Sequence, residues 1–263
     1  MVYNSIVDIS TIFTIGDFMK FSHNYNIRWH DTNANRELTP SAVLTLMQET
    51  THMHIQTFYP SLEYIRDELH KAFILSKVYM RFYEPAYAYE DITVETWTGV
   101  ESRGFTFYRS FCVKRGDTVI ADALTTWCLI DTLEHKLLPV KSFENNFVDE
   151  PSLAVDMPRK IKFPDQPPEF VGTRRIVYSD IDYNMHMNNT HYPSMVIDFL
   201  PSPENHRIKE LMLSFVSGSV YNDEIKIYRS QNEDTYYFKT LSSNDKICLE
   251  AFIKTEPQDS QIR

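Results

Sequence analysis

The first sustained pattern of apolar positions in the chain predicts an α-helix that begins near residue 40. Thr39 is suited to cap its N-terminus, and Pro40 fits the first helical position. Apolar or small residues then recur close to the helical period, whereas polar residues such as Gln48 and His52 occupy other faces. The recurring positions are Val43, Leu46, Met47, Thr50, Met53, Ile55 and Phe58. The pattern predicts a helix of about five turns with one apolar side.

Four segments after this helix have the composition of β-strands. They are rich in aromatic and β-branched residues. Turn signals separate them, such as the sequence Lys-Arg-Gly-Asp at residues 114–117. The segments are residues 73–83, 92–97, 105–113 and 118–131. A long helix followed by an antiparallel meander is an α+β unit.

Residues 139–172 have no sustained period and contain six prolines. Because proline disfavours helices and central strands, this stretch is predicted to be a linker that crosses the surface. It divides the chain into an N-terminal unit, residues 1–138, and a C-terminal unit, residues 173–263.

The pattern of the first unit returns after the linker. Ile-Arg-Trp-His-Asp at residues 27–31 matches Ile-Val-Tyr-Ser-Asp at residues 176–180, an offset of 149 that also places Asn35 on Asn184. A shorter helix is predicted over about residues 191–200. Further strands are predicted at residues 211–216, 224–229, 235–241 and 246–255. Two tandem copies, each a helix wrapped by an antiparallel sheet, predict a double hotdog fold, in which each unit covers the open sheet edge and face of the other.

Composition narrows the class of protein. The chain has 263 residues, of which 43% are hydrophobic, and its formal net charge of −10 argues against a general nucleic-acid binder. It lacks an apolar run of the roughly 18 residues that a membrane span needs. Its N-terminal sequence lacks the regions of a secretory signal, so a cytoplasmic location is expected. Three cysteines in separate segments fit a reduced protein, not a disulfide framework.

Neither a cofactor nor a metal is expected. The chain has six glycines and contains neither glycine-rich nucleotide-binding motif nor the Gly-x-Ser-x-Gly elbow of hydrolases. His, Cys and carboxylate side chains do not cluster at metal-ligand spacing anywhere in the sequence.

Residues 178–189 concentrate side chains that could carry chemistry. If this backbone is extended, Asp182, Asn184 and His186 share one face, because side chains alternate along a strand. A histidine can transfer a proton near neutral pH, a carboxylate can orient it, and an amide can donate a hydrogen bond to an oxyanion. Hydrolysis of an activated acyl group needs these three functions. The alternative is structural, with an asparagine of the segment capping the next helix and a histidine that only supports the fold.

This segment resembles the signature of plant and bacterial acyl-ACP thioesterases, a Ser-Asp-x-Asp-x-Asn-x-His-x-Asn-Asn run that carries their catalytic residues. The first unit is also similar to that family at residues 46–50, at residues 89–97 and at Arg109. The similarity covers about residues 22–256, and the run in the second unit is its specific part. The resemblance implies that the Asp-Asn-His set is catalytic. It also implies hydrolysis of fatty acyl thioesters of acyl carrier protein, which releases free fatty acid in fatty acid biosynthesis.

The repeat predicts a single active site. At the offset of 149, the three catalytic candidates correspond to Asn33, Asn35 and Glu37, so the first copy lacks the histidine. The first copy is therefore expected to hold the acyl chain. Its candidate tunnel residues are Leu46, Met47, Thr50, Met53 and Trp97. Each of these could equally be ordinary core.

One departure from the family bears on the mechanism. Plant members carry a Glu and a Cys early in the second-half sheet, and the matching residues 214–221 contain neither. The three cysteines lie in other predicted strands and resemble small buried hydrophobes. We therefore expect direct attack by water, with His186 as general base, Asn184 positioning or polarising the thioester carbonyl, and Asp182 orienting its neighbours.

A locally basic stretch is the candidate docking site for the carrier protein. Acidic carriers would be attracted to it electrostatically, although a solvated linker face has the same composition. Its residues are Arg159, Lys160, Lys162, Arg174 and Arg175.

Two other functions stay open. One is hydrolysis of acyl-CoA thioesters, although single-hotdog CoA enzymes usually lack the tandem signature. The other is a non-catalytic module that binds acyl chains, since a fold does not fix a function. The sequence decides neither the preferred chain length nor whether two chains form a homodimer, because a tandem duplication already contains the pairing that single hotdogs obtain by dimerising.

Overall fold

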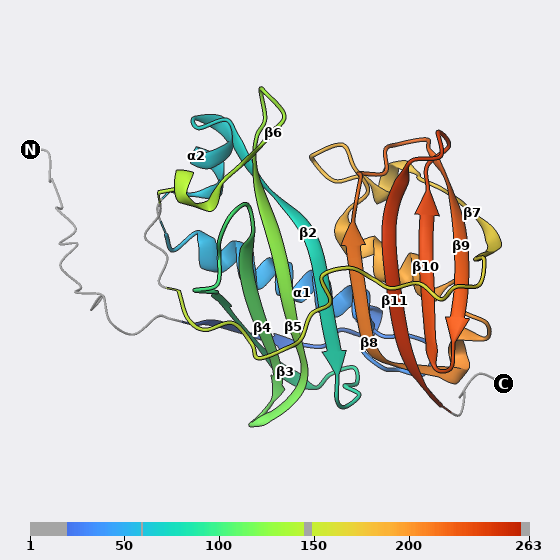
Figure 1. Cartoon of the computed structure of the whole chain (residues 1–263). Coiled ribbons are helices and arrows are strands. Elements are labelled where there is room, and N and C mark those ends of the chain that lie inside the picture. Colours follow the sequence, from blue (N-terminus) through green and yellow to red (C-terminus); the bar gives the residue numbers. More distant parts are fainter. Residues whose placement is uncertain (1–19, 59, 145–148, 259–263) are drawn as a thin grey trace, which may run out of the picture.

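Antiparallel strands from both halves of the chain join into one sheet. The computed structural model describes residues 20–58, 60–144 and 149–258. The first half contains β1 (Phe21–Asn26), β2 (Lys71–Phe82), β3 (Asp91–Thr98), β4 (Phe107–Arg115), β5 (Thr118–Asp131) and β6 (Lys136–Leu138). The second half contains β7 (Glu169–Arg175), β8 (His206–Phe215), β9 (Glu224–Asn232), β10 (Thr235–Leu241) and β11 (Ile247–Pro257). Figure 1 shows the halves side by side, and they meet where β2 pairs with β8.

The strand order shows the duplication directly. The 11-stranded sheet runs β1-β3-β4-β5-β2-β8-β11-β10-β9-β7, with β6 paired to β5. Read outward from the central seam, each half therefore has the same arrangement, because β2 and β8 take the same place, and so do β1 and β7 at the two edges. The predicted double hotdog, an α+β fold, is confirmed.

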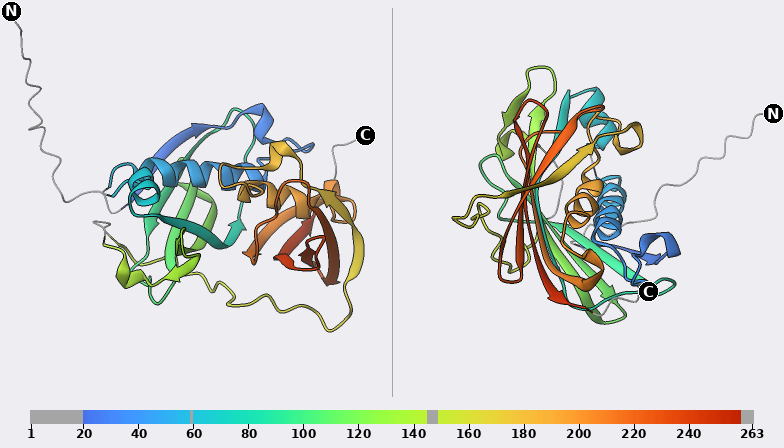
Figure 2. Two further views of the ribbon diagram at one scale, coloured as in Figure 1. Left: turned by 90° about the horizontal axis from the view of Figure 1, so that it is seen from above. Right: turned by 90° about the vertical axis from the view of Figure 1, so that its right-hand side faces the viewer.

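In the part of the chain that the structure describes, three α-helices pack against the sheet, and Figure 2 shows α1 and α3 on the same face. They are α1 (Pro40–Ile55), α2 (Leu62–Asp67) and α3 (Tyr192–Ile197). The Thr39 side chain accepts a hydrogen bond from the Ala42 N–H at 3.2 Å, so the predicted cap is confirmed. The helix ends before Phe58, because the Phe58 N–H bonds to the Ile55 carbonyl in a tighter turn. No helix in the described ranges is both long enough and apolar enough to cross a membrane.

The predicted strands are all present, and β5 and β10 have the predicted bounds. The sequence patterns missed β1, β6, β7 and α2. β1 and β7 are the edge strands, whose side chains are largely exposed, so they show no apolar alternation. β7 begins at Glu169, inside the stretch that the prolines identify as a linker.

The linker crosses the outer face of the sheet, opposite α1 and α3 (Figures 1 and 2). Tyr79 of β2 and Met212 of β8 are cross-strand partners at the central seam. Ile161 of the linker is buried against this pair in a small apolar cluster. The linker thus helps to hold the two halves together by covering apolar surface at their junction.

Candidate active site

The segment with the three catalytic candidates forms a tight turn and is not extended. The Asp182 N–H donates to the His186 carbonyl at 2.9 Å, and the Met185 N–H donates to the Asp182 carbonyl at 3.0 Å. Met185 has a φ of 63°, in the left-handed region. The three side chains therefore come from one short turn, and strand alternation does not place them on a common face.

Asn184 and His186 are exposed in this turn, and Asp182 is half-buried. The Asp182 carboxylate accepts a hydrogen bond from the Asn184 N–H at 2.8 Å, a side-chain contact typical of Asx turns. Across the turn, the guanidinium carbon of Arg66 lies 5.5 Å from the centre of the Tyr183 ring. Because Arg66 belongs to α2, the turn of the second half lies against the first half.

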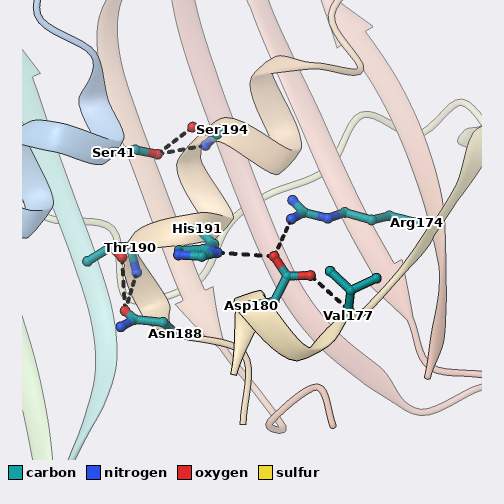
Figure 3. Close-up of polar contacts among 8 residues, drawn as sticks. All are labelled: Ser41, Arg174, Val177, Asp180, Asn188, Thr190, His191 and Ser194. Carbon is teal, nitrogen blue, oxygen red and sulfur yellow. Dashed lines mark hydrogen bonds and ion pairs between the residues drawn. The ribbon is translucent and has the colours of Figure 1, made fainter. Parts of the chain in front are cut away.

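A buried carboxylate, Asp180, lies just before the turn in the chain (Figure 3). Asp180 accepts hydrogen bonds from the Val177 N–H at 3.0 Å and from Arg174 at 2.7 Å, and His191 Nδ1 lies 3.1 Å away. Burial raises the pKa of Asp180, but these bonds and the charge of Arg174 outweigh it and hold the pKa below its ordinary value. Asp180 therefore stays ionised and anchors the loop, a role that the sequence patterns did not identify.

Asn188 is a helix cap, as the structural alternative predicted. Its side chain accepts the Thr190 N–H at 3.0 Å, at the start of the short 3₁₀ turn that precedes α3. Next to it, the Ser41 and Ser194 hydroxyl oxygens lie 2.7 Å apart and link α1 to α3 (Figure 3).

The first copy contains the same turn with different side chains. The Asn33 N–H donates to the Glu37 carbonyl at 2.9 Å, the Arg36 N–H donates to the Asn33 carbonyl at 2.9 Å, and Arg36 has a φ of 65°. The Asn35 N–H donates to the Asn33 side chain at 2.9 Å, as in the second copy. The match confirms the offset of 149 at the level of single hydrogen bonds, and it confirms that Glu37 stands where the second copy has a histidine.

Two side chains of this first turn are buried and make hydrogen bonds to the second half of the chain. Glu37 is buried, accepts a hydrogen bond from Arg207 at 2.7 Å and accepts another from Gln258 at 2.9 Å. Asn35 is also buried and donates to the Glu204 carbonyl at 2.9 Å. A cavity of about 60 Å³ lies beside Glu37. The residues that line this cavity do not include a copy of the Asp-Asn-His set.

The candidate tunnel residues do not lie together. Met47 and Thr50 are buried on the sheet-facing side of α1, and Leu46 and Met53 are half-buried. Trp97 lies on the other face of the sheet, where its Nε1–H donates to the Pro151 carbonyl at 2.9 Å beneath the linker. The structure therefore separates Trp97 from the four helix residues.

The basic stretch is also divided. Arg174 donates a hydrogen bond to the Asp180 carboxylate at 2.7 Å, and Arg175 donates to the Asn222 side chain at 3.0 Å. Arg159, Lys160 and Lys162 are exposed on the linker, on the sheet face opposite the helices.

Sequence reasoning did not connect two buried polar side chains of the first half. An Nη of Arg109 lies 3.1 Å from His54 Nδ1 and donates to the Thr96 hydroxyl at 3.2 Å. Burial lowers the pKa of Arg109 to about 10. Burial and then the Arg109 charge lower the pKa of His54 to about 3, so this histidine is neutral.

The cysteines do not offer a nucleophile at the turn. Cys112 and Cys248 are buried, and burial raises the pKa of the Cys112 and Cys128 thiols. Among the residues that the structure describes, no three His, Cys, Asp or Glu side chains group as metal ligands.

The fold and this turn define a class of protein, a double hotdog with one Asp-Asn-His turn. The sequence matches the model of the acyl-ACP thioesterase N-terminal domain over residues 19–145 and that of the C-terminal domain over residues 170–254. The chain therefore belongs to the acyl-ACP thioesterase family, whose members are thioester hydrolases.

Curated relatives are distant in sequence. The oleoyl-acyl carrier protein thioesterase of Coriandrum sativum is 22% identical over 273 residues, which cover 94% of this chain and 72% of the relative. A palmitoyl-acyl carrier protein thioesterase of Gossypium hirsutum is 23% identical over 219 residues, or 76% of this chain. The matched region covers 52% of the cotton protein, so this chain spans about half its length.

Solved structures show the same fold. An acyl-ACP thioesterase from Bacteroides thetaiotaomicron superposes with a TM-score of 0.80 at 20% identity, covering 90% of this chain and 98% of that one. The 12:0-ACP thioesterase from Umbellularia californica has a TM-score of 0.76 at 16% identity, covering 91% of this chain and 98% of that one.

Proposed function

We propose that this chain hydrolyses fatty acyl thioesters of acyl carrier protein at the turn from Asp182 to His186. The comparison of the two turns carries the proposal. They share their backbone hydrogen bonds, yet only the second has a histidine, and Asn184 and His186 are exposed there whereas the matching Asn35 and Glu37 are buried. Substrate can reach that turn, whereas the second half covers the first one.

In the proposed mechanism, His186 removes a proton from water as the water oxygen attacks the thioester carbonyl carbon. The Asn184 amide donates to the carbonyl oxygen as it becomes negative. The tetrahedral intermediate then collapses, the carbon–sulfur bond breaks, and the imidazolium returns its proton to the departing thiolate. The products are the free fatty acid and the carrier thiol.

Hydrolysis of acyl-CoA thioesters is the alternative within the same chemistry. Arg159 and Lys160 are exposed and support docking of a carrier protein, since long-range attraction of an acidic partner needs free surface cations. If this stretch docks the carrier, added salt will raise KM for acyl-ACP more than for acyl-CoA. Equal salt dependence for the two substrates would favour the CoA reaction or a different docking surface.

The test is fatty acid release from matched acyl-ACP and acyl-CoA thioesters by wild type, His186→Ala and His30→Ala. We expect His186→Ala to lose roughly 10²–10⁴-fold in kcat, the usual contribution of a general base. His30, an exposed histidine of the first copy, serves as the control and should be silent. If wild type turns over neither substrate, the protein is better described as a non-catalytic module that binds acyl chains.

Assembly and location complete the proposal. Pairing of β2 with β8 within one chain supplies the contact between two hotdog units, so a homodimer is not needed for that contact. Sedimentation of the active protein decides whether a homodimer forms.

We also propose a cytoplasmic location on account of the three free cysteines, to be checked by cell fractionation.

A further inference from the structure

We propose that Gly218 is a positioning residue for His186, an inference that rests on the proposed function of that histidine. Residues 216–220 follow β8 and pass beside the turn, and the His186 ring lies directly against the Gly218 backbone. A Cβ at position 218 would lie 2.2 Å from His186 Cδ2 and 2.9 Å from both Cγ and Nε2. No side chain larger than hydrogen fits unless the ring moves.

The glycine is required by this close approach and not by its backbone conformation. Its φ is outside the left-handed region, unlike those of Gly104 and Gly116, where φ is 62° and 58°. An alanine at position 218 would therefore be tolerated by the backbone, and its effect would fall on the ring that it meets.

Hydrogen bonds hold the glycine segment in place beside the turn. The Met187 N–H, next to the histidine, donates to the Ser219 carbonyl at 2.8 Å. The Tyr192 hydroxyl at the start of α3 donates to the Ser219 hydroxyl at 3.0 Å, and both residues are buried. The segment thus forms a fixed surface against which an exposed imidazole can pack.

The first copy provides an internal comparison. There the Leu38 N–H donates to the Ala86 carbonyl at 2.7 Å. Glu37 forms an isolated antiparallel β-bridge with Tyr87, as His186 does with Val220. Gly218 therefore corresponds to Pro85, which has a Cβ. The side chain of Glu37 turns instead to Arg207. The copy with the histidine has the glycine, and the copy without it does not.

Restricting the ring matters because His186 is exposed and would otherwise move among rotamers. A general base must be held close to its productive geometry, and a misplacement of about 1 Å can cost about 10²-fold in rate. Packing on Gly218 removes orientations of the imidazole without using either ring nitrogen.

The experiment measures kcat and KM for Gly218→Ala, with Ser217→Ala as the neighbouring control. Ser217 is exposed, and its hydroxyl bonds to the Ile247 carbonyl and not to the histidine. We expect Gly218→Ala to lower kcat between about 10-fold and 10²-fold with KM within a factor of about two, and Ser217→Ala to match wild type. The thermal midpoint of Gly218→Ala should stay near that of wild type, because the site is exposed.

A double-mutant cycle separates positioning from a general structural effect. If Gly218 acts through the imidazole, Gly218→Ala will cause no further loss in a His186→Ala background. The proposal is overturned if Gly218→Ala keeps wild-type kcat, or if it costs the same factor with and without the histidine. Full activity of His186→Ala alone would instead refute the proposed function.

Discussion

Asp182 has one role in the turn and another in the proposed chemistry, and the first copy separates the two. Its carboxylate accepts the Asn184 N–H at 2.8 Å. In the first copy the neutral side chain of Asn33 accepts the Asn35 N–H at 2.9 Å and maintains the same turn. An amide oxygen is therefore sufficient for this turn, so the negative charge of Asp182 is not needed to form it.

We predict that Asp182→Asn will fold normally and lose activity. The turn should persist, so the thermal midpoint should stay near that of wild type. We expect kcat to fall between about 10-fold and 10⁴-fold, since replacing a carboxylate that orients a histidine can cost as much as the upper figure. Asn33→Asp, the reciprocal change, should leave kcat unaltered. Wild-type kcat in Asp182→Asn would show that the charge has no part in the reaction.

At the scale of elements, the end of α1 and strand β4 enclose a polar pair in an apolar interior. Arg109 lies between Phe107 and Phe111 on β4, which belong to two different apolar clusters. His54, in the last turn of α1, is buried between the rings of Phe21 and Phe58, whose centroids lie 5.3 Å and 4.6 Å away. Protonation of His54 would place a second charge beside Arg109 in this interior.

This pair predicts a loss of stability in acid. The folded-state pKa of His54 is lowered from 6.5 to about 3, so between these values the unfolded state binds the additional proton. The contribution is fully present above pH 6.5 and declines as the pH falls through this window, with a slope of up to about 1.4 kcal/mol per pH unit. Denaturant unfolding from pH 7 to pH 4 measures it.

A pair of histidine variants isolates the contribution of His54. In His54→Gln, whose amide oxygen can accept from Arg109, the free energy of unfolding should depend less on pH than in wild type. His52→Gln, which changes an exposed histidine on the same helix, should keep the wild-type slope. The same slope in all three proteins would mean that other groups cause the acid sensitivity.

At the scale of the whole molecule, duplication produced one exposed site and one internal cross-link. Glu37 of the first turn binds Arg207 of β8 and Gln258 near the C-terminal end of β11. The two halves are thus joined by the β2–β8 pairing, by the linker over the seam and by this partly buried polar contact. In the second half the same turn contacts α2 through Tyr183 and keeps Asn184 and His186 exposed.

We predict that Glu37→Ala will destabilise the fold without removing the chemistry. The loss of a partly buried, charge-assisted contact should lower the free energy of unfolding by about 2 kcal/mol. Glu84→Ala, which breaks a more exposed ion pair with Arg115, should cost less than about 1 kcal/mol. Urea unfolding compares the two variants. Similar losses in the two variants would show that the Glu37 contact adds nothing beyond a surface ion pair. The kcat of Glu37→Ala should match that of wild type below its unfolding temperature.

Local patterns predicted the parts of the fold that have strong local signals. The cap at Thr39, the central strands and the repeat are visible in the sequence because burial imposes a period and duplication leaves matching residues. The edge strands β1 and β7 were missed because one neighbour and wide exposure leave their composition unconstrained. The Asp-Asn-His set came from its motif, but its shape did not, since a turn closed by backbone hydrogen bonds has no periodic signal.

By itself, the sequence determined that there are two hotdog copies, that only the second has the histidine, and that the chain belongs to a thioesterase family. Only the tertiary structure decided which side chains are available to a substrate. Exposure depends on contacts between residues far apart in the chain, such as Glu37 with Arg207 and His186 with Gly218. Such contacts form only when segments far apart in the chain are brought together by folding, so no local pattern can encode them.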